Sequence, residues 1–161
     1  MIVSGTIAAD DAYKGLRPEI LLLIAGMVTI GLSLEITGLA AAATQAMLGL
    51  VRSLGPFAAL ALLYGATLFL TEILSNAAVA VLVTPIAVAL AQSLGVNARP
   101  FLVAVMMAAS AAFATPFGYQ TNVLVYQVGG YSYTDFVKIG VPLNLLTWLV
   151  GVLVIPVFFP F

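Results

Sequence analysis

The fold is decided by the stretch PFAALALLYGATLFLTEILSNAAVAVLVTPIAVALAQS, residues 56–93, in which two apolar arms flank the polar pair Ser75–Asn76. Read as one helix, this stretch would be about 57 Å long, roughly twice the hydrocarbon thickness of a bilayer. The chain must therefore turn, and Ser75–Asn76 is the strongly polar, turn-forming pair within the run. Two arrangements fit the pattern: two full spans joined by a loop, or a re-entrant helical hairpin whose tip lies inside the membrane.

The composition excludes an ordinary water-soluble domain. Of the 161 residues, 63% are hydrophobic and 7% are charged, whereas soluble domains carry about 25% charged residues. The solvent of this chain is therefore mostly lipid. We expect residues 1–161 to form a single all-α, multi-pass transmembrane domain in the cell membrane.

Missing residue types narrow the function further. The chain contains no cysteine and no histidine, which excludes thiol nucleophiles, zinc–thiolate sites and Ser-His-Asp triads. We therefore expect no enzyme. The five basic residues are scattered, so no basic stripe for a nucleic-acid partner exists. Residues 1–9 lack the positive flank of a secretory signal.

The remaining segments follow from the hydropathy pattern. Residues 18–36 are nineteen largely apolar residues, about 28 Å as a helix, and predict a first span. The alanine-rich residues 37–54 predict an arm helix lying at the interface or against a neighbour. A broken helix is expected over 99–128. Residues 134–159 predict the final span, with Thr134 as its N-cap.

The break within the broken helix is expected over residues 115–122, TPFGYQTN, because proline and glycine interrupt the pattern there. The preceding helix, residues 101–114, would cover only about 21 Å, short of a full crossing. The sequence therefore predicts a break inside the membrane. A proline-kinked helix or a surface loop is the alternative interpretation.

Two interruptions at depth have a chemical consequence. Non-helical backbone within a membrane occurs only where it is buried in protein or lines a wet cavity. A helix that stops points free carbonyls at the gap, and a helix that restarts points free N–H groups there. Carbonyls with Asn and Thr oxygens suit Na⁺, whereas N–H ends suit a carboxylate or a sulfate. A site for a cation and an anion can thus form with almost no formal charge.

Glu72 is an acidic residue one helical turn before Ser75. It either tunes the electrostatics of the hairpin tip or accepts hydrogen bonds from a neighbouring helix. We favour the second, supporting role.

At these residues the sequence resembles a known family. Residues 71–77, TEILSNA, followed by Thr84-Pro85-Ile86, resemble the hairpin of the divalent anion:sodium symporter family, within the wider ion transporter superfamily. That family carries Ser-Asn-Thr at the tip, and this chain has Ala77 in the third position. Residues 114–122, ATPFGYQTN, are similar to the family's unwound helix, in particular to its sulfate and dicarboxylate permease branch.

The resemblance implies one inverted repeat, the second, of an elevator-type transporter with a re-entrant hairpin and a broken transmembrane helix. It implies a secondary transporter that couples Na⁺ to uptake of a divalent anion and is incomplete without its first repeat and a homodimeric partner. It implies Na⁺ ligands at Thr71, Leu74 (carbonyl), Asn76 and Gly118 (carbonyl). It implies substrate-binding residues at Ser75, Asn76, Tyr119, Thr121 and Asn122.

Other classes remain open at the level of sequence. Transport of arsenite, of a citrate–metal complex, or of Na⁺ against H⁺ shares the hairpin plan. The chain can also be a half-transporter that pairs with a second chain, or an assembly subunit without a transport role. An intramembrane enzyme is disfavoured, because Glu35 and Glu72 lie on different segments. The pattern decides neither the anion, nor Na⁺ against H⁺ coupling, nor membrane orientation.

Overall fold

The computed structural model describes residues 25–26, 29–30, 32–33, 36–51 and 54–161. The predicted span over 18–36 therefore falls largely outside the described residues. Within the described part every regular element is a helix, which confirms the all-α class. The helices are α3 (Leu39–Val51), α4 (Gly55–Thr71), α5 (Asn76–Leu94), α6 (Arg99–Ala109), α7 (Gln120–Gly129) and α8 (Tyr133–Phe158).

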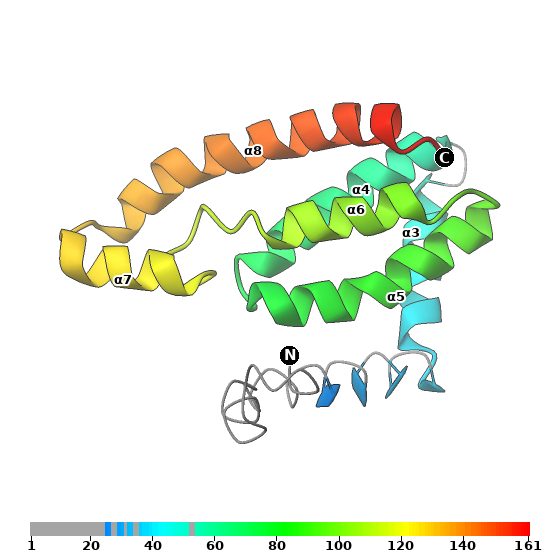
Figure 1. Ribbon diagram of the computed structural model, residues 1–161, viewed down its shortest axis with the longest axis horizontal. Helices are drawn as coiled ribbons and strands as arrows, with labels where there is room; N and C mark the ends of the chain where they lie inside the picture. Colours follow the sequence, from blue (N-terminus) through cyan, green and yellow to red (C-terminus); the bar gives the residue numbers. More distant parts are fainter. Residues whose placement is uncertain (1–24, 27–28, 31, 34–35, 52–53) are drawn as a thin grey trace, which may run out of the picture.

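Helices α4 and α5 fold back on each other through residues 72–75, which we call the hairpin turn (Figure 1). Pro56 stands in the first turn of α4, where its missing N–H is harmless. Ser75 is the N-cap of α5, and its hydroxyl accepts a 3.3 Å hydrogen bond from the Ala78 N–H. Gly95 ends α5 with φ +68°, a left-handed conformation that favours glycine.

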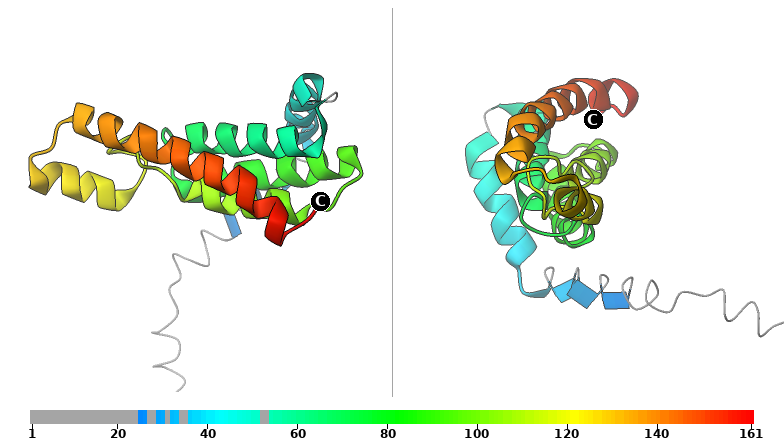
Figure 2. Two further views of the ribbon diagram at one scale, coloured as in Figure 1. Left: turned by 90° about the horizontal axis from the view of Figure 1, so that it is seen from above. Right: turned by 90° about the vertical axis from the view of Figure 1, so that its left-hand side faces the viewer.

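The core lies where α4, α5 and α6 meet, and α8 covers the side formed by α4 and α6 (Figure 2). Its largest fully buried side chains include Leu60, Leu63, Tyr64, Leu90 and Phe101. The indole Nε1 of Trp148 donates a 2.9 Å hydrogen bond to the Ala61 carbonyl and so ties α8 to α4. Helix α7 stands apart, beyond the turn end of the α4–α5 hairpin (Figure 1), and has no buried residue.

The interruption between α6 and α7 is placed differently from the prediction. Helix α6 ends at Ala109 rather than at 114, and residues 110–119 are non-helical; we call them the break segment. Gln120, Thr121 and Asn122, predicted within the break, instead form the first turn of α7. The prediction failed because the alanines of 110–114 favour a helix, whereas the Phe113 and Ala114 N–H groups and the Ala112 carbonyl have partners outside the helix, described below.

The last helix also begins differently from the prediction. Its N-cap is Ser132, not Thr134, and Ser132 and Asp135 form a reciprocal capping box. Among the described residues, α5 and α8 are long and apolar enough to cross a membrane. Helices α3, α4 and α6 are shorter and apolar.

Candidate ion-binding site

The hairpin turn and the break segment are in direct contact, although some forty residues separate them. The Thr115 hydroxyl donates a 2.9 Å hydrogen bond to the Glu72 backbone carbonyl. The N–H groups of Phe113 and Ala114 donate to Glu72 Oε1 at 3.0 and 2.9 Å. The N-terminal end of α7 is thereby brought close to the N-terminal end of α5 (Figure 1).

Four polar groups converge at this contact. The Thr71 hydroxyl lies 2.8 Å from the Ala109 carbonyl and 2.9 Å from one end of the Asn76 side-chain amide. That same amide end lies 3.1 Å from the Ala109 carbonyl and 3.2 Å from the Gly118 carbonyl. Thr71 is fully buried. We call Thr71 Oγ1, the Asn76 amide, and the carbonyls of Ala109 and Gly118 the oxygen cluster.

The orientation of the Asn76 amide decides what the oxygen cluster can do. With its nitrogen turned inward, Asn76 donates to Thr71 Oγ1 and to both carbonyls. With its oxygen turned inward, four oxygens would face one another with only the Thr71 proton between them, and a cation would relieve their mutual repulsion. The orientation with the nitrogen inward satisfies all four groups by hydrogen bonds, and only the other orientation presents four oxygens.

The predicted Na⁺ ligands are only partly brought together. Thr71, Asn76 and Gly118 meet in the oxygen cluster. Leu74 lies in the hairpin turn and is 38% exposed, and among the described residues no hydrogen bond joins its carbonyl to the cluster. Its role as a ligand stays a prediction. The Ala109 carbonyl, at the last turn of α6, was not predicted, because the type of a residue does not indicate where its backbone carbonyl points.

The predicted substrate residues surround the two helix N-termini. Ser75 is exposed and caps α5, and Thr121 and Tyr119 are exposed at the start of α7. Tyr119 is the N-cap of α7 and makes no side-chain capping bond, so the first N–H groups of α7 have no cap. Asn122 has a structural contact: its Nδ2 donates to the carbonyls of Ala112 and Thr115 at 2.8 and 3.2 Å.

Gly118 has no room for a side chain. A Cβ there would lie 2.9 Å from the Ala112 Cβ, 3.0 Å from the Thr71 carbonyl and 3.2 Å from the Thr115 hydroxyl. The glycine is what allows the break segment to approach the end of α4 so closely.

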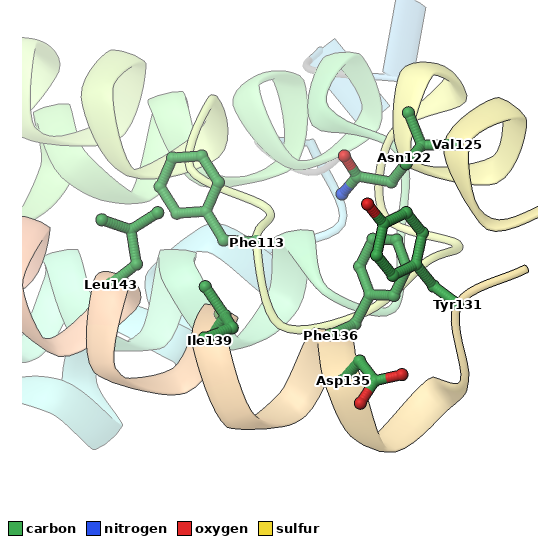
Figure 3. A pocket seen from close by; sticks show the side chains of 9 residues that line it. Phe113, Asn122, Val125, Tyr131, Asp135, Phe136, Ile139 and Leu143 are labelled. Atoms are coloured by element: carbon green, nitrogen blue, oxygen red, sulfur yellow. The ribbon is translucent and has the colours of Figure 1, made fainter. Parts of the chain in front are cut away.

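A separate cavity of about 270 Å³ lies between α7, α8 and the break segment (Figure 3). Phe113, Ile139 and Leu143 line one side of it, and Asn122 and Tyr131 the other. Its wall is mostly apolar, and none of the four groups of the oxygen cluster reaches it. This cavity is therefore not the ion site.

Interrupted helices that meet at a cluster of oxygens are the arrangement in which membrane transporters hold ions. Comparison with known proteins agrees with that class. The chain belongs to the citrate transporter family, whose family model matches residues 1–160. The resemblance to sodium-coupled anion symporters read from the two motifs is confirmed.

Three relatives show the range of the family. An uncharacterized transporter of Synechocystis is 42% identical over 92% of this chain and 24% of its own length. Sodium/sulfate cotransporter 1 of Chlamydomonas reinhardtii is 36% identical over 92% of this chain and 17% of its own length. A sodium-dependent dicarboxylate transporter of Staphylococcus saprophyticus is 33% identical over 90% of this chain and 28% of its own length. The chain thus spans about a quarter of such relatives, or less.

Proposed function

We propose that this chain forms part of a multi-pass transporter of the cell membrane that couples Na⁺ to uptake of a divalent anion. The oxygen cluster carries the proposal, because Thr71, Asn76 and Gly118 reach it from three separate segments, and Ala109 adds a fourth oxygen. Hard cations such as Na⁺ prefer oxygen ligands. The sodium-coupled relatives support the same reading.

The length of α6 supports a site at membrane depth. Helix α6 starts at Arg99, after the loop 95–98 in which Gly95 and Asn97 are exposed, and its eleven residues rise about 17 Å before the break segment. The hydrocarbon core is about 30 Å thick. On this reading the break segment lies near mid-depth, and the hairpin turn, hydrogen-bonded to it, lies there as well. That favours a re-entrant hairpin over two full spans.

The anion is proposed to bind beside the cation, at the N-terminal ends of α5 and α7. Ser75 is the N-cap of α5, and the first N–H groups of α7 have no side-chain cap from Tyr119. Asn76 and Thr121 belong to the first turns of these two helices. Asn122, in the first turn of α7, holds that turn against the break segment through its two hydrogen bonds. Helix N-termini stabilise negative charge. Sulfate is the first anion to test, with succinate as the dicarboxylate comparison, because relatives named for each exist.

On this proposal the chain contributes one repeat, and a first repeat completes the second sodium site and the substrate shell. The protein then works as a homodimer by an elevator motion. The rival reading, an assembly subunit without transport, predicts that polar residues at the hairpin turn are dispensable.

The experiment is a sodium titration of the thermal unfolding of the purified chain in detergent, with choline keeping the ionic strength constant. Sodium bound only to the folded state stabilises it by ~2.7 kcal/mol at a hundredfold excess over Kd. We expect Na⁺ to raise the Tm of the wild type and not of Asn76→Ala. Asn97→Ala, in the loop between α5 and α6, is the control; it removes one local hydrogen bond to the Arg99 N–H and should keep the response.

A second arm adds sulfate or succinate at saturating Na⁺. A further rise in Tm that Ser75→Ala abolishes supports the anion site. A wild-type Tm that responds equally to Na⁺ and choline rejects the sodium site.

A further inference from the structure

The two carboxyl oxygens of Glu72 differ in their hydrogen bonding. Its Oε1 accepts three hydrogen bonds: from the Phe113 and Ala114 N–H groups, and from Asn144 Nδ2 at 2.6 Å. Its Oε2 is buried without a partner, as is Asn144 Oδ1. In the described part of the chain, no basic side chain contacts it. One oxygen atom thus joins the hairpin turn, the break segment and α8.

A short chain of hydrogen bonds runs from Glu72 to the oxygen cluster. The Glu72 carbonyl accepts from the Thr115 hydroxyl, and the same hydroxyl accepts a 3.2 Å hydrogen bond from the Gly118 N–H. The Gly118 carbonyl lies in the cluster, 3.2 Å from the Asn76 amide. Residue 72 therefore fixes the break segment on both sides of Thr115. Its carboxylate binds the N–H groups of 113 and 114, and its backbone carbonyl, which side-chain variants keep, reaches 118 through the Thr115 hydroxyl.

We propose that Glu72 and Asn144 are a positioning pair for the cation site. Glu72 Oε1 holds the break segment so that the Gly118 carbonyl faces Asn76, and Asn144 makes α8 part of the same rigid unit. The role is geometric: it requires an acceptor oxygen at Oε1 and not a negative charge. The inference rests on the proposed sodium site, but the hydrogen-bonded clamp can be tested separately.

Glu72→Gln separates geometry from charge. Its amide oxygen can take the place of Oε1 and accept all three hydrogen bonds, while the charge is gone. Glu72→Ala removes the acceptor, and Asn144→Ala removes one of the three bonds and serves where Glu72→Ala fails to fold. Even at the strength of bonds to an uncharged acceptor, loss of all three hydrogen bonds in Glu72→Ala should shift an equilibrium that depends on them about tenfold or more.

The sodium titration is repeated on these variants. We expect the sodium concentration giving half the Tm shift to rise about tenfold or more in Glu72→Ala and to rise measurably in Asn144→Ala. Glu72→Gln should stay within about threefold of the wild type, as should Asn97→Ala. Unchanged sodium affinity in Glu72→Ala overturns the inference. Equal loss in Glu72→Gln and Glu72→Ala also overturns it, because the charge and not the position would then matter.

Hydrogen exchange without sodium tests the clamp by itself. The amides of Phe113 and Ala114 should exchange slowly in the wild type and in Glu72→Gln, and faster in Glu72→Ala. If the wild type shows no sodium response, the proposed function fails, and the exchange pattern still decides whether Glu72 holds the break segment. Fast exchange of both amides in the wild type contradicts the clamp.

Discussion

At the scale of single residues, the groups that converge between the hairpin turn and the break segment are uncharged. Asn76 can offer either end of its amide to Thr71, Ala109 and Gly118. A neutral ligand set avoids burying charge, which is costly in a membrane. In the described part of the chain, the carboxyl beside the cluster, that of Glu72, faces backbone N–H groups instead of the cluster. The interpretation of Glu72 as a hydrogen-bonded support agrees with this geometry.

Gly118→Ala tests how tightly the break segment is fitted. The added Cβ would meet the Thr71 carbonyl and the Ala112 Cβ at about 3 Å. We expect the free energy of unfolding to fall by roughly 1–3 kcal/mol, the usual range for overpacking. Gly49→Ala in α3, where a Cβ meets nothing within 4 Å, is the control and should be neutral or slightly stabilising. Similar stability for the two variants would show that the contact is looser than described.

At the scale of elements, α8 packs closely against α4 and the break segment. It approaches the break segment at Gly140, whose added Cβ would collide with the Phe113 carbonyl group, and α4 at Gly151, beside the Tyr64 ring. Trp148 and Asn144 add hydrogen bonds to α4 and to the hairpin turn. Small residues allow this close approach between membrane helices.

The two glycines of α8 should differ in sensitivity. Gly140→Ala meets backbone, which cannot move away, whereas Gly151→Ala meets the edge of a side chain. We expect Gly151→Ala to lower the free energy of unfolding by about 1–3 kcal/mol. Gly140→Ala should lower the Tm more than Gly151→Ala does. Leu153→Ala, on the exposed face of α8, is the control. The reverse order of the two glycine variants would contradict the close contact at Gly140.

The start of α8 gives an independent test of an element boundary. Ser132 caps the helix, so Ser132→Ala should lower the free energy of unfolding by about 0.5–2 kcal/mol. Thr134→Ala, at the residue predicted as the cap, should cost less. Chemical unfolding of the two variants side by side checks this, with the exposed Ser93→Ala in α5 as a reference. A larger loss for Thr134→Ala would restore the boundary predicted from the sequence.

At the scale of the whole molecule, burial is uneven. Helices α4, α5 and α6 share the core, whereas α7 has no buried residue. Aromatic side chains attach α7 to the break segment and to α8: the Tyr126 ring lies 6.4 Å from that of Phe117 and 6.0 Å from that of Phe136, measured between centroids. An element with few buried contacts opens at low free energy.

Hydrogen exchange across the whole chain should therefore show a gradient. We expect the backbone amides of α7 to exchange much faster than those of α4 and α6 in detergent, because local opening follows burial. Added Na⁺ and sulfate should slow α7 selectively, since its N-terminus lies at the proposed anion site. Protection of α7 equal to that of α6 would indicate that further chain or a partner covers it.

The local features of this protein follow from residue order. Apolar length and the near absence of charge determined a helical membrane chain, and the polar pair at Ser75–Asn76 determined where the hairpin turns. The two motifs determined the family. These features can be predicted from the sequence because periodicity, turn residues and span length are properties of short, continuous segments.

Only the tertiary structure decided which groups meet. Glu72 and Asn144 are 72 residues apart, and the Ala109 carbonyl belongs to a residue with no polar side chain. The end of α6 was decided in the same way. The N–H groups of Phe113 and Ala114 bond to Glu72, and the Ala112 carbonyl accepts from Asn122. Partners from distant segments replace helical hydrogen bonds there, so a stretch that favours a helix by propensity forms a break instead.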